Sequence, residues 1–514
     1  MSPHSAKMSS HRSQQNGTSS TMVLELSDLS DTQNRISPIH SNEKDRPRPS
    51  SLRELGRTLS KEDNDENEGE TLPSPTTAVE KVQRWNEPRV NMVRSFGAFF
   101  SFIILGANDA ALGALIPYLQ DYYNLSYTVV SLAFLSPLAG YISAALLNNT
   151  IHLRFGQRGI AIIGPCSHIL AYTVTAVHPP FPVIAVVFAL AGFGSGVEDA
   201  AWNAWMGAMA NANEILGFLH GFYGLGATIA PIVATTLVTQ AGVEWYYFYY
   251  FMIGMATIEL AVCSTSFWSA SGAEFRRLNP RTTESKDNRM TEALFRRPAA
   301  RVTWLCTLFL FGYMGIEVAL GGWITEFMLS VRKGGRFASG MTATGFWLGM
   351  TVGRVVLGFV TPRIGENLAI IIYIPITIAL ELLFWLVPQF YVSAVSVAFQ
   401  GFFLGPLFPA AVVAVSKLLP RHLHVSALGF ASAVGFSGAA LFPFAVGAIA
   451  QTRGVEVLQP VILALLVVVL GVWFGLPGMA GKGHEGGGER VRREGWRGVV
   501  DRVKGWARGR FVRR

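Results

Sequence analysis

The residues of this sequence best able to do chemistry are carboxylic acids inside otherwise apolar runs. Asp109 lies in GANDAALG, Glu198 and Asp199 are adjacent in GFGSGVEDAAWNAW, and Glu317 lies in GYMGIEVALGGW. An ionisable group inside a membrane span is costly and usually faces a cavity or a partner. Loss of water disfavours the charged form of a carboxylate, so such a group can gain and lose a proton near neutral pH. These four acids are therefore candidates for binding a proton or a polar solute.

Three further polar residues accompany these acids. Asn108 and Asn203 offer hydrogen-bond donors and acceptors of the kind that a polyol needs. Adjacent helix positions are turned by about 100°, so Asp199 shares a face with Asn203 rather than with its neighbour Glu198. The alternative to a binding role for Asp199 is a structural hydrogen bond within the helix bundle. His220, in GFLHGFYGLG, is open to either a cavity role or a packing role. The acids Glu259 and Glu381 are interpreted as helix-packing or vestibule residues.

The composition indicates the environment of these residues. The chain has 514 residues, of which 50% are hydrophobic and 15% charged. A soluble domain of this size needs more surface charge, so the composition predicts an integral membrane protein. The net charge of +8 does not indicate a nucleic-acid partner, because the basic residues lie mainly beside apolar runs. The expected surroundings are a lipid bilayer.

The middle of the chain contains twelve apolar stretches of about 20 residues, the length that crosses a bilayer as a helix. A polar break with seven Lys/Arg divides them into six and six. The predicted organisation is a disordered cytosolic tail at 1–92, six-helix bundles at 93–268 and 301–478, a cytosolic central loop at 269–300, and a basic cytosolic tail at 479–514. Positive charge before the first span, in the break and after the last span places both termini in the cytoplasm. The fold class is therefore all-α, with twelve transmembrane helices.

The two halves repeat one another in sequence. A shift of 209 residues places Gly192 and Gly196 on Gly401 and Gly405, and a shift of 212 places Gly226 on Gly438. Duplicated six-helix halves with a binding site between them are an architecture of secondary transporters. Glycine pairs four residues apart also let helices approach closely, which explains these glycines without any role in solute binding.

Two loops resemble the loop motif of the major facilitator superfamily. They are RFGQR, with Arg154 and Gly156, and RIGEN, with Arg363 and Gly365. The run VGR, ending at Arg354, resembles the upstream part of that motif, and these five residues are expected to serve as gating elements. The usual acidic position is Leu153 in one copy and Pro362 in the other, so the usual latch does not carry over to the first copy.

The runs GANDAALG and EDAAWN resemble the fucose/glucose:proton symporter branch of that superfamily. The resemblance implies that Asn108 and Asp109 in the first span, and Glu198 and Asn203 in the fourth, bind sugar and proton. His220 falls where bacterial members carry a glutamine, and Asp199 falls where a neutral residue is usual. The long polar tails suggest a fungal member.

No motif of soluble enzymology is present. The sequence contains no Walker motif, no His/Cys cluster with metal-ligand spacing and no dinucleotide-binding fingerprint. We therefore expect no enzyme activity, no cofactor and no metal. The predicted function is proton-coupled symport of a sugar or similar small polar solute, and the protein is expected to act as a monomer. The expected location is the plasma membrane, with a vacuolar or other endomembrane as the alternative. A non-transporting sensor and an uncoupled facilitator on the same scaffold remain alternatives.

Overall fold

The computed structural model describes residues 83–210, 212–278, 286–420 and 423–477, and within these ranges the regular secondary structure is helical apart from one isolated bridge between Arg84 and Glu87. Twelve helical segments in these ranges are long and apolar enough to cross a membrane. The prediction of an all-α membrane protein with twelve spans is thereby confirmed. Most of the predicted N-terminal tail and the predicted C-terminal tail lie outside the described residues.

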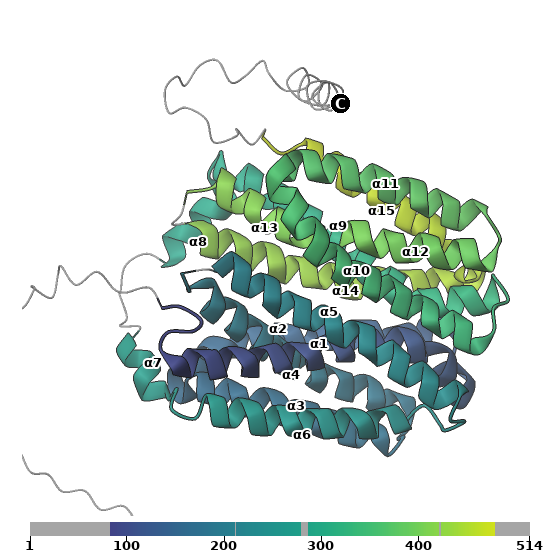
Figure 1. Ribbon diagram of the computed structural model, residues 1–514, viewed down its shortest axis with the longest axis horizontal. Helices are drawn as coiled ribbons and strands as arrows, with labels where there is room; N and C mark the ends of the chain where they lie inside the picture. The colour runs from purple at the N-terminus through teal and green to yellow at the C-terminus, as the bar shows by residue number, and fades with distance from the viewer. Residues whose placement is uncertain (1–82, 211, 279–285, 421–422, 478–514) are drawn as a thin grey trace, which may run out of the picture. The chain divides into compact units, whose positions relative to one another are not determined.

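The first six spans are single helices joined by short connections (Figure 1). They are α1 (Arg89–Tyr123), α2 (Tyr127–Phe155), α3 (Gln157–Ala176), α4 (Phe181–Gly207), α5 (Ala212–Thr239) and α6 (Tyr247–Ser266). The connection after α1 shows how local chemistry sets such bounds. Asn124 ends α1 in the left-handed conformation with φ 52°, and the Ser126 side chain accepts a hydrogen bond from the Val129 amide to begin α2.

The predicted central loop contains two short helices, α7 (Gly272–Leu278) and α8 (Lys286–Phe295), and the second six spans follow them. These spans are α9 (Ala299–Ser330), α10 (Arg336–Ile364), α11 (Glu366–Leu386), α12 (Phe390–Leu404) with α13 (Leu407–Leu418), α14 (His424–Arg453), and η2 (Val455–Val457) with α15 (Leu458–Phe474). The tenth span is divided between α12 and α13 at Gly405 and Pro406. Proline lacks an amide hydrogen for the helical ladder, which accounts for a break there.

The glycine repeat seen in the sequence corresponds to repeated helix packing. A Cβ at Gly192 of α4 would lie 2.5 Å from the Pro137 carbonyl oxygen of α2. A Cβ at Gly401 of α12 would lie 2.2 Å from the Phe346 carbonyl oxygen of α10. Both members of each pair are related by the same shift of 209 residues, so the two halves repeat the same close helix crossing. This equivalence confirms the two six-helix repeats.

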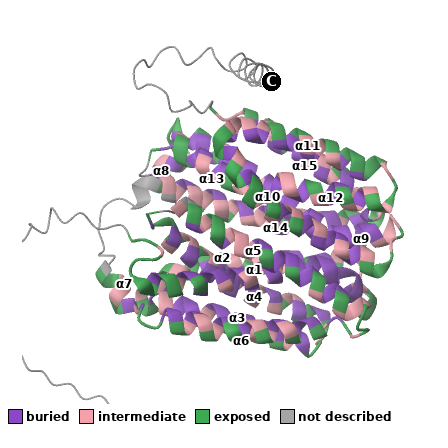
Figure 2. Cartoon of the chain, viewed as in Figure 1, coloured by how far each residue is buried: buried purple, intermediate pink, exposed green. Residues whose placement is uncertain are grey.

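Exposed positions occur along the spanning helices (Figure 2). Many of them carry large apolar side chains, as a lipid-facing surface requires. Leu146 is 75% exposed and Val186 is 72% exposed, although both belong to spanning helices. Inward faces carry small and aromatic side chains instead. A polar side chain in a membrane span is costly where it faces lipid, so buried polar side chains are expected only where neighbouring helices separate them from lipid. Such side chains are therefore candidates for a functional role.

Candidate functional site

Asp109 lies in the middle of α1 and takes part in a hydrogen-bond network that joins three helices. Its Oδ2 accepts a hydrogen bond from the Tyr223 hydroxyl of α5 at 2.9 Å, and its Oδ1 accepts one from Asn108 Nδ2 at 3.1 Å. The Tyr172 hydroxyl of α3 donates to Asn108 Oδ1 at 3.1 Å. Asn108 and Asp109 are both partly exposed. The predicted pair thus offers an oriented carboxylate that is not sealed from its surroundings.

Glu317 forms an ion pair within the second half of the chain. Its Oε1 lies 2.9 Å from Arg354 Nη2, and the two side chains are only 7% and 12% exposed. Arg354 also lies over the Tyr223 ring of the first half, with 5.8 Å between the guanidinium carbon and the ring centroid. Tyr223 therefore contacts Asp109 through its hydroxyl and Arg354 through its ring. One continuous series of contacts joins the Asp109 and Glu317 carboxylates across the two halves.

Asp199 belongs with Asp109 rather than with its neighbour Glu198. Asn203 Nδ2 donates to Asp199 Oδ1 at 3.0 Å, in the arrangement expected from their spacing. Both side chains are partly exposed, and Asp199 lies within electrostatic range of Asp109. Tyr141 of α2 lies near both acids. Asp109 and Asp199 can therefore act on one solute.

Glu198 does not share the surroundings of Asp109 and Asp199. It is fully buried, accepts a hydrogen bond from the Ser101 hydroxyl at 2.6 Å, and interacts with the charges of His168 and Glu259. The resemblance implies that Glu198 binds sugar and proton together with Asp109, whereas these contacts direct its carboxylate between α1, α3 and α6. The reason is the turn of about 100° between adjacent helix positions, which gives the face near Asp109 to Asp199.

His220 occupies an aromatic contact between the two halves. Its ring centroid lies 5.7 Å from that of Phe102 in α1 and 5.8 Å from that of Phe408 in α13. It also lies within electrostatic range of Arg354. The structure therefore places His220 near Arg354, and its role in solute binding stays a prediction.

The first of the two predicted loops is packed tightly. Arg154 is exposed, but Gly156 is buried with φ 73°, and a Cβ there would lie 2.4 Å from the Ala270 carbonyl oxygen. The Arg158 amide donates to the same oxygen at 3.0 Å. Gly156 thus allows the connection between α2 and α3 to rest against the chain that follows α6.

The second loop is more open. Arg363 is exposed, and Gly365 has φ 87°, where an added Cβ would meet nothing within 4 Å. Arg354 does not belong to this loop, because it lies inside α10 and pairs with Glu317. The gating role expected for Arg354 stays a prediction, and its observed partner is Glu317 of α9.

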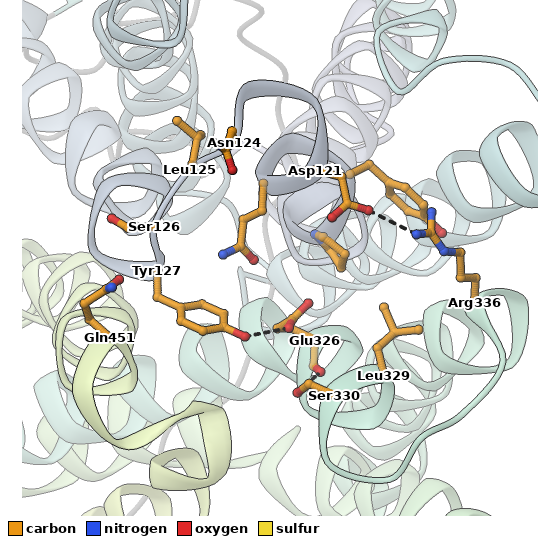
Figure 3. Close-up of a pocket in the computed structure, with 13 residues that line it drawn as sticks. Asp121, Asn124, Leu125, Ser126, Tyr127, Glu326, Leu329, Ser330, Arg336 and Gln451 are labelled. Atoms are coloured by element: carbon orange, nitrogen blue, oxygen red, sulfur yellow. Dashed lines mark hydrogen bonds and ion pairs between the residues drawn. The ribbon is translucent and has the colours of Figure 1, made fainter.

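A cavity of about 660 Å³ lies where the end of α1 and the start of α2 meet the end of α9 and the start of α10 (Figure 3). We call this end of the helices the Asn124 end and the opposite end the Phe155 end. Two contacts join the halves beside the cavity. The Tyr127 hydroxyl donates to Glu326 Oε1 at 2.9 Å, and Arg336 Nη2 lies 3.1 Å from Asp121 Oδ2.

Glycine contacts differ between the two ends for the same helix pairs. Toward the Asn124 end, a Cβ at Gly340 of α10 would lie 2.3 Å from Thr235 Oγ1 of α5, and one at Gly447 of α14 would lie 2.4 Å from Ser131 Cβ of α2. Toward the Phe155 end, a Cβ at Gly358 of α10 or Gly429 of α14 would meet nothing within 4 Å. At these positions the halves are packed more closely at the Asn124 end.

Several residues that build the site were not predicted. His168, Tyr172 and Ser101 belong to it, and so does Tyr223, which contacts both Asp109 and Arg354. A histidine in the apolar run of the third span was the one available signal, because a titratable group at membrane depth marks a functional site by default. The others are common packing residues whose role depends on their neighbours in space.

Known proteins resemble this chain in sequence and in structure. The sequence model of the Major Facilitator Superfamily matches residues 98–390 and 332–511. Bypass of stop codon protein 6 of Saccharomyces cerevisiae is 30% identical over 475 residues, covering 84% of this chain and 94% of that protein. The Glucose/mannose transporter GlcP of Bacillus subtilis is 19% identical over 378 residues, covering 73% of this chain and 92% of that protein. A crystal structure of a D-xylose-proton symporter is similar with a TM-score of 0.61 at 13% identity, covering 75% of this chain and 98% of that one.

Proposed function

The chain belongs to the major facilitator superfamily of transporters, and from that premise we propose that it carries out proton-coupled symport of a sugar or a similar small polar solute. The observation that carries this proposal is the series of contacts from Asp109 through Tyr223 and Arg354 to Glu317. It contains a carboxylate from each half, so a change in protonation or in solute occupancy at Asp109 alters a contact between the halves. The names of the similar bacterial glucose/mannose transporter and D-xylose-proton symporter support the choice of solute class.

The solute is held between the halves by polar side chains from both of them. Asp109, Asp199 and Asn203 provide acceptors and donors from the first half, and Arg354 provides donors from the second. A sugar hydroxyl both donates and accepts hydrogen bonds, so it can satisfy a carboxylate and an amide together. Tyr141 and Tyr223 add aromatic faces near these groups.

Transport proceeds by alternating access, with bundles 93–268 and 301–478 moving as bodies. The closer packing at the Asn124 end, compared with the open positions at Gly358 and Gly429, supports a state closed at that end. The rocking motion that such repeats permit would separate Tyr127 from Glu326 and bring the Phe155 ends together. The Phe155 end faces the cytoplasm in this proposal, and the protein acts as a monomer in the plasma membrane.

The test is uptake by the purified full-length protein in liposomes under an imposed pH gradient. D-glucose, D-mannose and D-xylose form the solute panel, and a protonophore removes the gradient. By one-to-one symport, a gradient of one pH unit drives about tenfold accumulation. We expect accumulation that the protonophore abolishes and that Asp109→Asn removes.

Other outcomes identify the alternatives. Equilibration without accumulation would identify an uncoupled facilitator. No uptake of any panel member, together with a solute-dependent cellular response that is lost on deletion of residues 1–80, would identify a sensor. Transport that survives this deletion supports the proposal.

A further inference from the structure

Three titratable side chains from different helices meet inside the first half of the chain. His168 of α3, Glu198 of α4 and Glu259 of α6 are each fully buried, and one donor atom from each lies within 4.8 Å of the others. His168 Nδ1 lies 3.1 Å from Glu259 Oε2. We call these three residues the buried triad. None of them was predicted to act together with the others.

The buried triad is incompletely paired. Glu198 Oε1 and Glu259 Oε1 are buried and have no hydrogen-bond partner among the described residues. Two neighbouring carboxyl groups resist being ionised together, and a buried charge is costly without a partner. A proton on one carboxyl group supplies the donor that the other lacks. The arrangement is therefore suited to holding at least one proton.

Glycines on the neighbouring helices make room for the buried triad. A Cβ at Gly164 of α3 would lie 2.5 Å from Glu198 Cγ and 2.6 Å from Glu198 Oε1. A Cβ at Gly194 of α4 would lie 2.9 Å from His168 Nε2. Any larger side chain at either position would displace a member of the triad.

Each element packed against the buried triad presents polar or titratable groups to it. Helix α1 contributes Ser101, whose hydroxyl donates a hydrogen bond to Glu198, and Asp109, which interacts electrostatically with His168. Helix α4 contributes Ser195, whose hydroxyl oxygen lies 3.2 Å from His168 Nε2. The remaining groups are Tyr141 of α2, which meets Ser195, Tyr172 of α3, and Cys263 of α6. Within the described ranges, no lysine or arginine forms an ion pair with the triad.

The buried triad is linked to the acid that meets the solute. The His168 ring is stacked on the Tyr172 ring, with 5.8 Å between the centroids and 10° between the planes. The Tyr172 hydroxyl donates to Asn108 Oδ1, and Asn108 Nδ2 donates to Asp109 Oδ1, each at 3.1 Å. A change of charge at His168 therefore has a direct path of contacts to Asp109.

We propose that His168, Glu198 and Glu259 form a proton-binding site that is separate from the solute-binding face at Asp109 and Asp199. The proposal rests on the proposed symport and names the groups that hold its proton. The proton binds to one carboxyl group and is shared with the other, while His168 senses the charge of the pair and transmits it through Tyr172. Solute and proton are held by adjacent residues of α4 that face different surroundings.

The first experiment separates proton coupling from solute movement in liposomes. The probe is whichever panel sugar the wild-type protein transports best. Glu198→Gln and Glu259→Gln should keep sugar exchange at equal pH within a factor of about three and lose the roughly tenfold accumulation under a pH gradient. Glutamine has the shape of a protonated glutamate, so both variants should elute as folded protein in size-exclusion chromatography.

A matched control comes from the second half. Glu381 of α11 is also fully buried, and it accepts a hydrogen bond from Gln400 Nε2 at 2.7 Å. Glu381→Gln should retain both exchange and accumulation. Accumulation in Glu259→Gln equal to that of the wild type would overturn the proposal. His168→Asn should shift the pH dependence of accumulation, whereas a purely structural role would leave that profile unmoved.

The second experiment does not depend on any solute. Infrared spectroscopy of purified protein at neutral pH should show the carbonyl band of protonated carboxylic acid in the Glu381→Gln background. This band should lose intensity when Glu198→Gln and Glu259→Gln are added, and unchanged intensity would refute the site. If no panel sugar is transported, the proposed symport fails while this measurement still decides the buried triad. A stoichiometric metal ion in the purified protein that is lost in His168→Asn would instead assign the site to a metal.

Discussion

The Tyr223 hydroxyl donates a hydrogen bond to Asp109 Oδ2 at 2.9 Å, and this contact joins α1 to α5 within the first half of the molecule. The same tyrosine lies beneath the Arg354 guanidinium, which is paired with Glu317. The Tyr223 side chain therefore contacts an ionisable residue of each half. The state of Asp109 and the packing of α5 against α10 depend on one another.

Tyr223→Phe should weaken solute binding while preserving the contact with Arg354. The variant removes only the hydroxyl, and a hydrogen bond to a charged group is worth about 1.5–3 kcal/mol, so apparent affinity should fall roughly ten- to a hundredfold. Concentration dependence of uptake measures this loss. Tyr249→Phe is the control, because Tyr249 is a buried tyrosine of the same half whose ring lies 6.1 Å from the Tyr172 ring and which forms no hydrogen bond with Asp109 among the described residues. Equal affinities for the Tyr223→Phe variant and the wild type would contradict the role of this hydroxyl.

Arg354→Met should destabilise the protein more than the simultaneous loss of both ionic partners. Removing one member of a buried ion pair leaves an uncompensated charge, at a cost of about 3–5 kcal/mol. Thermal unfolding should therefore show a large loss for Arg354→Met and a recovery in Arg354→Met with Glu317→Leu. The ion pair of Lys417 and Glu366 provides a comparison, because Lys417 is 47% exposed while Glu366 is 9% exposed, so breaking this partly solvated pair should cost less. A single variant as stable as the double one would show that the pair is not buried.

Gly113→Ala should slow transport by disturbing the closely packed Asn124 end. A Cβ there would lie 2.1 Å from the Gly321 carbonyl oxygen of α9, and backbone cannot move aside as a flexible side chain can. Overpacking of this kind costs about 1–3 kcal/mol. Gly429→Ala meets nothing within 4 Å, so it should keep transport and gain up to about 1 kcal/mol from helix propensity. Initial uptake rates and unfolding temperatures should both fall for Gly113→Ala, and neither should fall for Gly429→Ala.

Gly156→Ala should be more damaging than Gly365→Ala, although both positions have positive φ. An alanine in such a conformation costs about 1–3 kcal/mol at either site. Only Gly156 adds a collision, with the Ala270 carbonyl oxygen at 2.4 Å from the Cβ position. The difference in thermal stability between the variants measures that collision. Equal losses would show that the two connections are packed alike.

The twelve spans and their repetition could be predicted from sequence because both depend on local properties. Apolar length fixes the spans, and the glycines at a shift of 209 residues mark equivalent crossings, as Gly192 on Pro137 and Gly401 on Phe346 show. The break in the tenth span was not predicted, although Pro406 is a local signal for it.

The arrangement of the candidate site was less predictable. Helix periodicity shows that Glu198 and Asp199 face different directions, but which of them faces Asp109 depends on the rotation of α4 against α1. That rotation is set by packing over the whole bundle. His168 and Glu259 come from two further helices, so their meeting with Glu198 follows only from the arrangement of α3, α4 and α6.

The adjacency of Glu198 and Asp199 also limits how this helix can evolve. A deletion or insertion of one residue between Phe181 and Glu198 would turn both carboxylates by about 100° relative to the preceding part of α4. Substitutions can change the surface of the helix one position at a time, but a change in its length would misplace both acids in a single event. A one-residue change in the length of α4 before Glu198 should therefore disturb the site more than the substitution of any single lipid-facing residue of this helix.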